Sequence, residues 1–351
     1  MGRLGHHRVV PQKTIVVVGG GVIGCAIAER LSRERQHRVI LCERDTVGAH
    51  ASGAAAGLLS PGTEAGAHAA ALAEGSLEAM AELVNRVERS GVDVEFRPGE
   101  SISPALSADE ERALRQGSWR WLDQEEARRE EPGLSRNVLG AAVNPAAQVT
   151  PGRLVQALAR TAVEQGAEVR EGWPVGQLLS RSGQLRGVQG PDGTLAADLV
   201  VLAAGPWSPA LASPAGVPID VRPSRGQLVM LRPRRTVLRR LLTWRDCYLV
   251  PKPDGSVVAG STEEEAGFDA RPTASGIAML LDFACRAVPE LEQATPVNVW
   301  AALRPATPSG EPIVGMAPGV HNLCVATGHN RSGILLAPVT AELVARELAA
   351  V

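Results

Sequence analysis

The chain has few aromatic residues and almost no lysine. Aromatic side chains make up 3% of its 351 residues, with a single tyrosine, and its lysines are Lys13 and Lys252. Arginine therefore supplies nearly all of the positive charge, and the formal net charge is −2. A chain so close to neutral gives no electrostatic reason to expect nucleic acid or a membrane surface as a partner. It also contains no apolar run of the length that crosses a bilayer.

Cysteine is sparse as well, and its spacing argues against the usual cysteine-based sites. The five cysteines form no C-x-x-C pair and lie at positions Cys25, Cys42, Cys247, Cys285 and Cys324. We interpret them as small buried hydrophobes rather than as metal ligands or disulfide partners. No P-loop and no cluster with the spacing of metal ligands is present, so we expect no metal. The first dozen residues lack the apolar core of a signal peptide, which favours a cytoplasmic protein.

A glycine-rich motif near the start indicates dinucleotide binding. A β-branched run at 14–18 predicts a buried strand, and apolar residues at helical spacing follow it. The residues of the intervening motif are Gly19, Gly21, Val22, Ile23 and Gly24. A second strand ends in Glu43, roughly 20 residues farther on, where a carboxylate binds a ribose hydroxyl. The glycines permit a tight turn, and the helix N-terminus attracts a pyrophosphate. The alternative is a glycine-rich turn that binds no ligand.

The segment after Glu43 favours FAD over a nicotinamide cofactor. Residues 48–58 are mostly glycine, alanine and serine, whereas a nicotinamide domain usually continues into a regular βα repeat. Backbone N–H groups and small hydroxyls can then approach a flat isoalloxazine ring and the phosphates closely. The alternative is a low-complexity linker.

The rest of the chain alternates between two kinds of pattern. An Ala-, Leu- and Glu-rich stretch at 66–90 predicts one long helix, and Thr150 before Pro151 predicts a helix start with Thr150 as its N-cap. Two stretches with strand-like alternation interrupt the α/β pattern. We therefore predict an α/β (mixed α+β) fold, with a Rossmann-type FAD-binding domain and an inserted mixed-sheet substrate domain. The predicted FAD-binding domain comprises residues 12–90, 148–207 and 305–351, and the substrate-binding domain comprises residues 91–147 and 208–304.

Three side chains are candidates for substrate binding. Arg304 ends an apolar segment that begins at Trp300, and a buried guanidinium needs an anion, such as a carboxylate held by two parallel hydrogen bonds. Arg331 lies in a glycine-flanked loop, and Tyr248 lies on an apolar strand. The alternatives are an internal ion pair or a surface position for Arg304, a surface position for Arg331 and a core position for Tyr248. His329 is interpreted as structural. A site without an obvious base suits a flavin, because the cofactor accepts the hydride.

Four segments carry a resemblance to a known family. They are residues 52–59, 246–251, 300–305 with Gly310 and Pro312, and 328–338. Together they resemble the D-amino-acid oxidase superfamily of FAD-dependent oxidoreductases, over nearly the whole chain, and within it the glycine oxidases of thiazole synthesis for thiamine.

The resemblance implies roles for individual residues. It implies that Arg304 binds the substrate carboxylate, that Tyr248 donates a hydrogen bond to it, and that Arg331 makes a second substrate contact. It also implies flavin contacts at Val22, Ile23, Glu43, Arg44, Ala51, Ser52, Ala56, Gly57, Leu58, Val175, His329, Asn330, Arg331, Ser332, Gly333, Ile334 and Leu335.

Departures from the family pattern concern substrate preference more than cofactor. Asn330 stands where an aromatic residue is common, and Ser332 replaces an asparagine. Sarcosine oxidases of the superfamily attach FAD to a cysteine, and none lies between residues 304 and 319. We therefore expect non-covalent FAD.

The activity implied by the resemblance is oxidative deamination of glycine and other small amines or D-amino acids. Molecular oxygen would be the acceptor, and the products would be a 2-oxo acid such as glyoxylate, ammonia and hydrogen peroxide. The alternatives are a dehydrogenase with another acceptor, a sarcosine or D-amino-acid oxidase of broader specificity, and a non-catalytic flavin-binding subunit. A tRNA-modifying relative should show a basic patch, against which the net charge argues. Relatives suggest a homo-oligomer.

Overall fold

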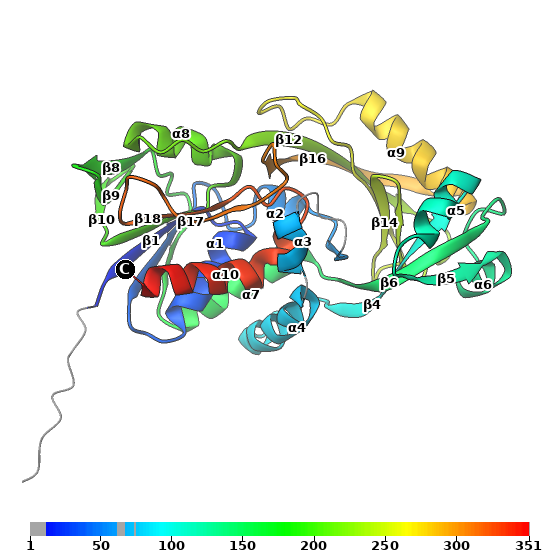
Figure 1. Cartoon of the computed structure of the whole chain (residues 1–351), viewed down its shortest axis with the longest axis horizontal. Coiled ribbons are helices and arrows are strands. Elements are labelled where there is room, and N and C mark those ends of the chain that lie inside the picture. Colours follow the sequence, from blue (N-terminus) through cyan, green and yellow to red (C-terminus); the bar gives the residue numbers. More distant parts are fainter. Residues whose placement is uncertain (1–11, 62–66, 74, 351) are drawn as a thin grey trace, which may run out of the picture.

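The computed structural model describes residues 12–61, 67–73 and 75–350, and a six-stranded and a nine-stranded sheet dominate it (Figure 1). Two earlier predictions fall partly outside the described residues. They concern the first dozen residues, of which positions 1–11 are not described, and the predicted long helix, whose first residue is Gly66. Within the described ranges, no helix has both the length and the hydropathy needed to cross a membrane.

The six-stranded sheet has the order β17-β18-β11-β1-β2-β7. The β-branched strand β1 (Thr14–Val18) pairs in parallel with β2 (Arg38–Cys42) on one side and with β11 (Leu199–Leu202) on the other. The remaining strands are β7 (Glu168–Arg170), β18 (Leu323–Thr327) and the antiparallel edge strand β17 (Ile313–Met316). A largely parallel sheet built from buried strands needs cover on both faces, and this one has it.

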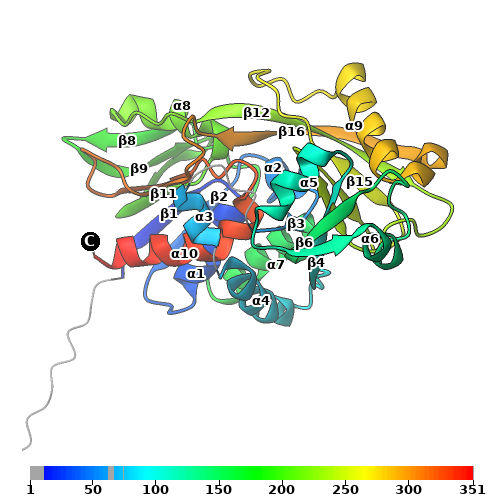
Figure 2. The ribbon, with the colours of Figure 1, turned by 45° about the vertical axis from the view of Figure 1, so that its right-hand side comes forward.

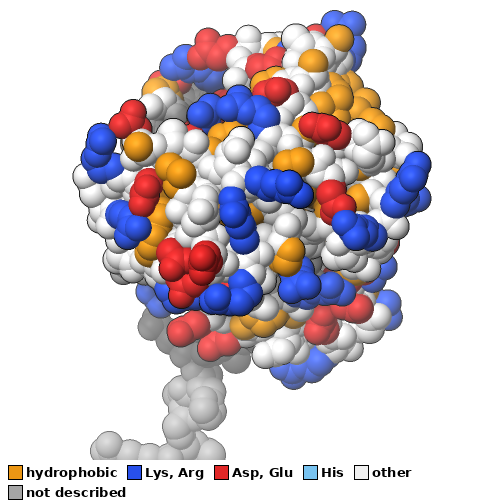
Figure 3. All heavy atoms as spheres, turned by 90° about the vertical axis from the view of Figure 1, so that its right-hand side faces the viewer, with side chains coloured by type: hydrophobic (Ala, Val, Ile, Leu, Met, Phe, Trp, Pro, Cys, Tyr) orange, Lys and Arg blue, Asp and Glu red, His pale blue; other side chains and the backbone are white. Residues whose placement is uncertain are grey.

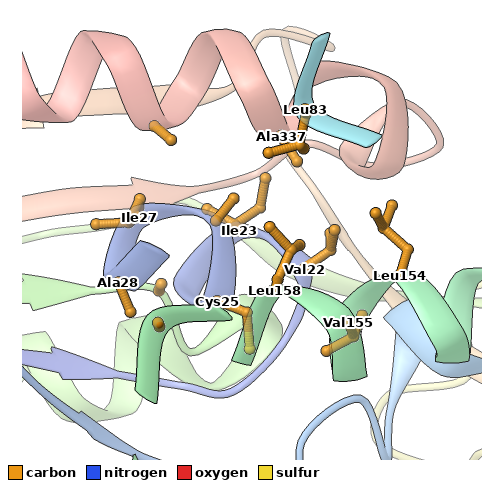
Figure 4. Close-up of a cluster of buried hydrophobic side chains, with 14 of the residues drawn as sticks. Val22, Ile23, Cys25, Ile27, Ala28, Leu83, Leu154, Val155, Leu158 and Ala337 are labelled. Atoms are coloured by element: carbon orange, nitrogen blue, oxygen red, sulfur yellow. The ribbon is translucent and has the colours of Figure 1, made fainter. Parts of the chain in front are cut away.

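Three helices cover one face, and a small sheet covers the other. The helices are α1 (Val22–Ser32), α7 (Pro151–Glu164) and α10 (Gly333–Ala349), and Figure 4 shows side chains of α7 and α10 meeting those of α1. The opposite sheet is antiparallel and consists of β8 (Gln177–Arg181), β9 (Gln184–Gly190) and β10 (Gly193–Ala196). Along β1, Ile15 and Val17 join the helical core, whereas Val16 and Val18 join the core under the small sheet. This alternation produces three layers and confirms the predicted fold class.

The nine-stranded sheet is mixed, with the order β16-β12-β15-β14-β13-β4-β6-β3 and β5 paired with β6. Its strands are β3 (Leu58–Leu59), β4 (Arg97–Ala105), β5 (Arg120–Asp123), β6 (Gly140–Gln148), β12 (Arg222–Arg232), β13 (Leu241–Trp244), β14 (Cys247–Pro251), β15 (Val257–Gly260) and β16 (Thr295–Ala306). The helices α5 (Ala108–Arg115), α6 (Gln124–Glu130) and α9 (Ala274–Ala287) accompany it. The long strands β12 and β16 run from beside the first sheet toward the far end (Figures 1 and 2). Basic and acidic side chains are interspersed on that end (Figure 3).

The shorter elements complete the chain order. The α-helical ones are α2 (Ala51–Ala54), α3 (Ala67–Ala73), α4 (Ser76–Val87) and α8 (Ser208–Ala212). The 3₁₀ turns are η1 (Glu88–Ser90), η2 (Gly205–Trp207), η3 (Ser213–Ala215) and η4 (Pro289–Gln293).

Three local expectations differ from the structure. The predicted long helix is two helices, because Gly75 between α3 and α4 has φ 73°, a left-handed conformation that ends a helix. The helix at Pro151 and its N-cap residue Thr150 are confirmed, but the Thr150 side chain makes no capping hydrogen bond, since its hydroxyl donates to Glu95 Oε2 at 2.5 Å instead. The strand β3 falls in the segment predicted for the FAD-binding domain but pairs with β6 in the nine-stranded sheet. The proposed domain boundaries otherwise stay a prediction.

Candidate active site

A cavity of about 900 Å³ lies where the carboxyl ends of β1, β2 and β11 meet the nine-stranded sheet. Crevices at the carboxyl ends of parallel strands are the usual ligand sites of open α/β sheets. The predicted site residues that line it are Gly19, Gly21, Val22, Ile23, Glu43, Arg44, Ala51, Ser52, Ala56, Gly57, Leu58, Val175, Tyr248, Arg304, His329, Asn330, Arg331, Ser332, Gly333, Ile334 and Leu335. Gly24 is the one predicted site residue that does not line the cavity. The structure thus brings together segments that are far apart in sequence, from Gly19 to Leu335.

The glycine turn after β1 forms one end of the cavity. Gly19 has φ 110°, and a Cβ there would lie 2.5 Å from the Ala203 carbonyl oxygen. A Cβ on Gly24 would lie 1.9 Å from the Gly19 carbonyl oxygen, so this third glycine lets α1 pack on the turn rather than touching a ligand. The Ser52 hydroxyl accepts the Val22 N–H at 2.9 Å, which fixes the loop containing α2 beside the helix N-terminus.

Glu43 is buried beneath this turn, with 6% of its surface exposed. Its Oε2 accepts the Gly20 N–H at 2.6 Å, and its Oε1 accepts the Asp45 N–H at 2.9 Å. Each carboxylate oxygen has a second lone pair, so the group can accept further hydrogen bonds from hydroxyls. This orientation suits the predicted contact with a ribose.

Aromatic and charged side chains form the wall next to Glu43. The Arg44 guanidinium lies 3.9 Å from the centroid of the Trp207 ring, and His50 lies 4.9 Å from the same ring, centroid to centroid. Glu43, Asp45 and His50 bring possible metal ligands within 4.8 Å of one another, a cluster that the sequence did not reveal. The hydrogen bonds from His50 and Arg44 hold the pKa of Asp45 below its usual value. Arg44 already supplies the positive charge that a cation would bring.

Arg304 is half-buried on β16 and faces the cavity. Its Nη1 donates to the Thr262 carbonyl at 3.1 Å, and its Nη2 donates to the Ser261 hydroxyl. A Cβ on Gly226 of β12 would lie 2.1 Å from Nη2, so only glycine leaves room for the guanidinium. Among the described residues, no carboxylate oxygen lies within 4.0 Å of it, which rules out the internal ion pair within that part of the chain.

The electrostatics around Arg304 favour an incoming anion. Burial lowers the pKa of Arg304, the neighbouring Tyr248 phenol raises it, and the Arg331 guanidinium lowers it. The Glu263 carboxylate also raises the pKa of Arg304, but no carboxylate among the described residues forms an ion pair with it. An arginine stays protonated at neutral pH despite such shifts, so the positive charge is retained. Tyr248 packs its ring against Gly260, where a Cβ would lie 2.7 Å from the ring. Tyr248 lines the cavity beside Arg304, and it also packs against the small core cluster that contains Leu228 and Val250.

Arg331 is exposed, and it also lines the cavity. Its Nη2 donates to the Asp246 carbonyl at 2.7 Å, in the turn between β13 and β14. Arg331 thus lies at the surface, as the alternative interpretation had it, and also at the mouth of the site, where the predicted substrate contact requires it.

Two buried polar atoms in the final loop have no partner in the described part of the chain. They are Nδ1 of His329 and Oδ1 of Asn330. The other ring nitrogen of His329, Nε2, lies 2.9 Å from the Thr340 hydroxyl, so part of its role is structural. Burial lowers the pKa of His329 to about 4, which keeps the ring neutral at pH 7. Unpaired buried polar atoms that line a cavity indicate hydrogen bonds to a ligand.

These features fit FAD. The glycine turn and Glu43 suit the phosphates and a ribose, the small-residue loop permits close approach of a flat ring, and the orphaned atoms offer it polar partners.

Several further residues that line the cavity could not be predicted from any motif in the sequence. Trp207, Ser261 and Gly226 are examples, because only tertiary pairing brings them here. Gly205 could have been found, since its segment follows a strand parallel to β1.

Comparisons with known proteins agree with this description. The family model described as FAD dependent oxidoreductase (DAO) matches residues 14–347. A glycine oxidase from Geobacillus kaustophilus is 36% identical, with 94% of this chain and 91% of that protein aligned. A crystal structure of glycine oxidase from Geobacillus kaustophilus superposes with a TM-score of 0.91 and 34% identity, covering 97% of this chain and 95% of that one.

Longer relatives match as well. The bifunctional protein ThiO/ThiG of Nostoc sp. is 35% identical over 95% of this chain, but the match covers 52% of that protein. The chain thus spans about half the length of these bifunctional relatives. A structure of L-proline dehydrogenase from P. horikoshii has a TM-score of 0.87 at 22% identity, a likeness of fold alone.

Proposed function

The chain belongs to the DAO family of FAD-dependent oxidoreductases, and on this premise we propose that it oxidises glycine and other small amino acids. In the proposed reaction, glycine, oxygen and water give glyoxylate, ammonia and hydrogen peroxide. The observation that carries the proposal is Arg304, a half-buried cation that faces the cavity, with no carboxylate partner among the described residues. A substrate carboxylate would supply the missing negative charge.

The proposed roles of the protein groups follow from their positions. Arg304 has five N–H donors, and its partners within the described structure are the Thr262 carbonyl, the Ser261 hydroxyl and the Tyr248 phenol, so donors remain for a substrate carboxylate. Tyr248 would donate a hydrogen bond to the same carboxylate, and Arg331 would contribute positive charge at the cavity mouth. When bound, FAD supplies the hydride acceptor for the substrate Cα and returns the electrons to oxygen. The protein thus orients the substrate and needs no general base of its own.

The glycine turn, Glu43, the small-residue loop at 51–58 and the final loop at 329–335 would hold the cofactor. We propose non-covalent attachment, since no cysteine lies between residues 304 and 319. We further propose that the product feeds thiazole synthesis for thiamine, because the chain resembles one half of the bifunctional ThiO/ThiG proteins. A cytoplasmic location, a homo-oligomer and a division into FAD-binding and substrate-binding domains belong to the same proposal.

The decisive experiment is anaerobic mixing of the FAD-loaded protein with candidate substrates. Glycine, sarcosine, D-alanine and D-proline should each be tested while the flavin absorbance is followed. We expect glycine to bleach the flavin, and air to restore the colour with release of hydrogen peroxide. Bleaching without reoxidation by air would make the protein a dehydrogenase. A flavin that no amino acid bleaches would make it a binding subunit and refute the proposal.

A further inference from the structure

Two side chains of the nine-stranded sheet hold the small-residue loop in place. Trp300 of β16 donates its indole N–H to the Ala54 carbonyl at 2.8 Å, and the Lys252 ammonium donates to the Ala56 carbonyl. Ala54 and Ala56 both line the cavity, whereas Lys252 and Trp300 are not among the residues that line it. The two donors therefore contact the loop from its outer side.

Peptide geometry then fixes the direction of the loop amides. In a trans peptide, the C=O of one residue and the N–H of the next point in opposite directions. Because the Ala56 carbonyl points to Lys252, the Gly57 N–H points away from it, on the side of the cavity. The Gly57 N–H makes no hydrogen bond within the described residues, whereas the Ala55 N–H, which lies opposite the Ala54 carbonyl, donates to the Ser52 carbonyl at 3.4 Å. Unpaired backbone donors next to a cavity call for a partner there.

Lys252 has surroundings that suit a dedicated donor. Its backbone is fixed in the turn between β14 and β15, where its N–H donates to the Ser256 carbonyl at 2.7 Å. The charged groups that face its ammonium are Glu95 and Asp254, and neither forms an ion pair with it within 4.0 Å in the described structure. Burial lowers the pKa of Lys252 to about 8. Half-burying an ammonium without a paired carboxylate costs free energy, which its hydrogen bond to the Ala56 carbonyl offsets in part.

We propose that Lys252 is a positioning residue, which holds the Ala56 carbonyl away from the cavity and so presents the Gly57 N–H to the flavin ring, and that Trp300 keeps the loop that carries this N–H in place through the Ala54 carbonyl. An N–H donor binds the reduced, more electron-rich ring more tightly than the oxidised ring. The two side chains therefore raise both the affinity for FAD and the reduction potential of bound flavin. The inference rests on the flavin lying in this cavity, as in the proposed function, and not on which amine is oxidised.

The test compares Lys252→Met and Lys252→Arg with Lys13→Met, the matched change at the chain's other lysine. The apoproteins are titrated with FAD by fluorescence, and the flavin potential is measured against a reference dye. We expect Lys252→Met to weaken FAD binding about tenfold, the size of one hydrogen bond from a charged donor, and to lower the potential. Lys252→Arg keeps a cationic donor and should restore most of both losses, while Lys13→Met should match the wild type.

Wild-type affinity and wild-type potential in Lys252→Met would overturn the inference, as would equal changes in Lys252→Met and Lys13→Met. If Lys252→Met does not fold, Trp300→Phe decides, because it removes one donor and keeps an aromatic ring. That variant must also lower the potential, and an unchanged potential would overturn the inference. Neither measurement uses an amino acid, so failure of the glycine proposal and failure of this one are distinguishable.

Discussion

Trp300 and Arg304 lie four residues apart on the same face of β16, and the first holds the cofactor loop while the second faces the cavity. Both pair with β12, through Leu228 and Ser224. Since side chains at even spacing on a strand share a face, one rigid element sets the distance between the small-residue loop and the candidate carboxylate anchor. The site thus depends on a strand that carries no cofactor-binding motif.

The first prediction concerns the cofactor. The purified protein should be yellow and should release intact FAD when it is denatured, without proteolysis, because no cysteine lies between residues 304 and 319. Absorbance of the supernatant after acid precipitation measures the release. Flavin that stays with the precipitate would contradict non-covalent binding.

Arg304→Ala should abolish useful turnover, mainly through substrate binding. A charge-assisted hydrogen bond is worth about 1.5–3 kcal/mol, so we expect a loss of kcat/KM of about 10- to 150-fold or more. Arg304→Lys should recover only part, because an ammonium cannot make two parallel bonds. Arg232→Ala, at an exposed position on β12, is the control and should leave the kinetics unchanged. Near-native kcat/KM in Arg304→Ala would place the carboxylate anchor elsewhere.

Gly226→Ala should displace the Arg304 guanidinium without unfolding the protein. The added methyl would lie 2.1 Å from Nη2, at the flexible end of a side chain that can move aside. We expect KM for glycine to rise about tenfold or more, with little change in the melting temperature. Gly99→Ala, which places its methyl in open space, is the matched control. An unchanged KM would mean that the position of this guanidinium does not matter.

Tyr248→Phe should cost about threefold to tenfold in kcat/KM, since it removes one neutral hydrogen bond worth about 0.5–1.5 kcal/mol. Arg331→Ala should lie between this loss and that of Arg304→Ala. Stopped-flow flavin reduction separates binding from chemistry. A thousandfold slower reduction in Tyr248→Phe at unchanged affinity would make the phenol an acid–base group. Unchanged flavin content and kinetics in Arg331→Ala would leave that arginine a surface residue.

His329 should make stability depend on pH. Its pKa is near 6.5 when unfolded but about 4 in the folded protein, so the unfolded state binds a proton first as the pH falls. The neutral ring contributes its full stabilisation above pH 6.5, and this contribution declines as the pH falls from 6.5 to 4. At pH 5 the free energy of unfolding has dropped by about 2 kcal/mol. Melting of the apoprotein at pH 7.5 and 5 should show a smaller drop for His329→Gln than for the wild type. His68→Gln, at an exposed position, should retain the full drop.

Local patterns were sufficient for the cofactor motif and insufficient for much of the substrate side. Gly19, Gly21 and Glu43 occur at spacings set by one strand, one turn and one helix, so the sequence alone could place them. Within the described residues Arg304 forms no ion pair, which depends on which strands pair with β16, and no local pattern encodes that pairing. The prediction of one long helix was wrong at Gly75, because composition cannot show where a glycine adopts a left-handed conformation.

The pairing of β11 with β18 has a consequence for synthesis on the ribosome. The glycine motif is made before residues 323–327, and the sheet that carries it gains β18 only when those residues have emerged. Until then, β11 presents Val200, Val201 and Leu202 along an open edge, which is a template for association with other chains. A fragment that stops before residue 320 should therefore aggregate even though its cofactor motif is intact.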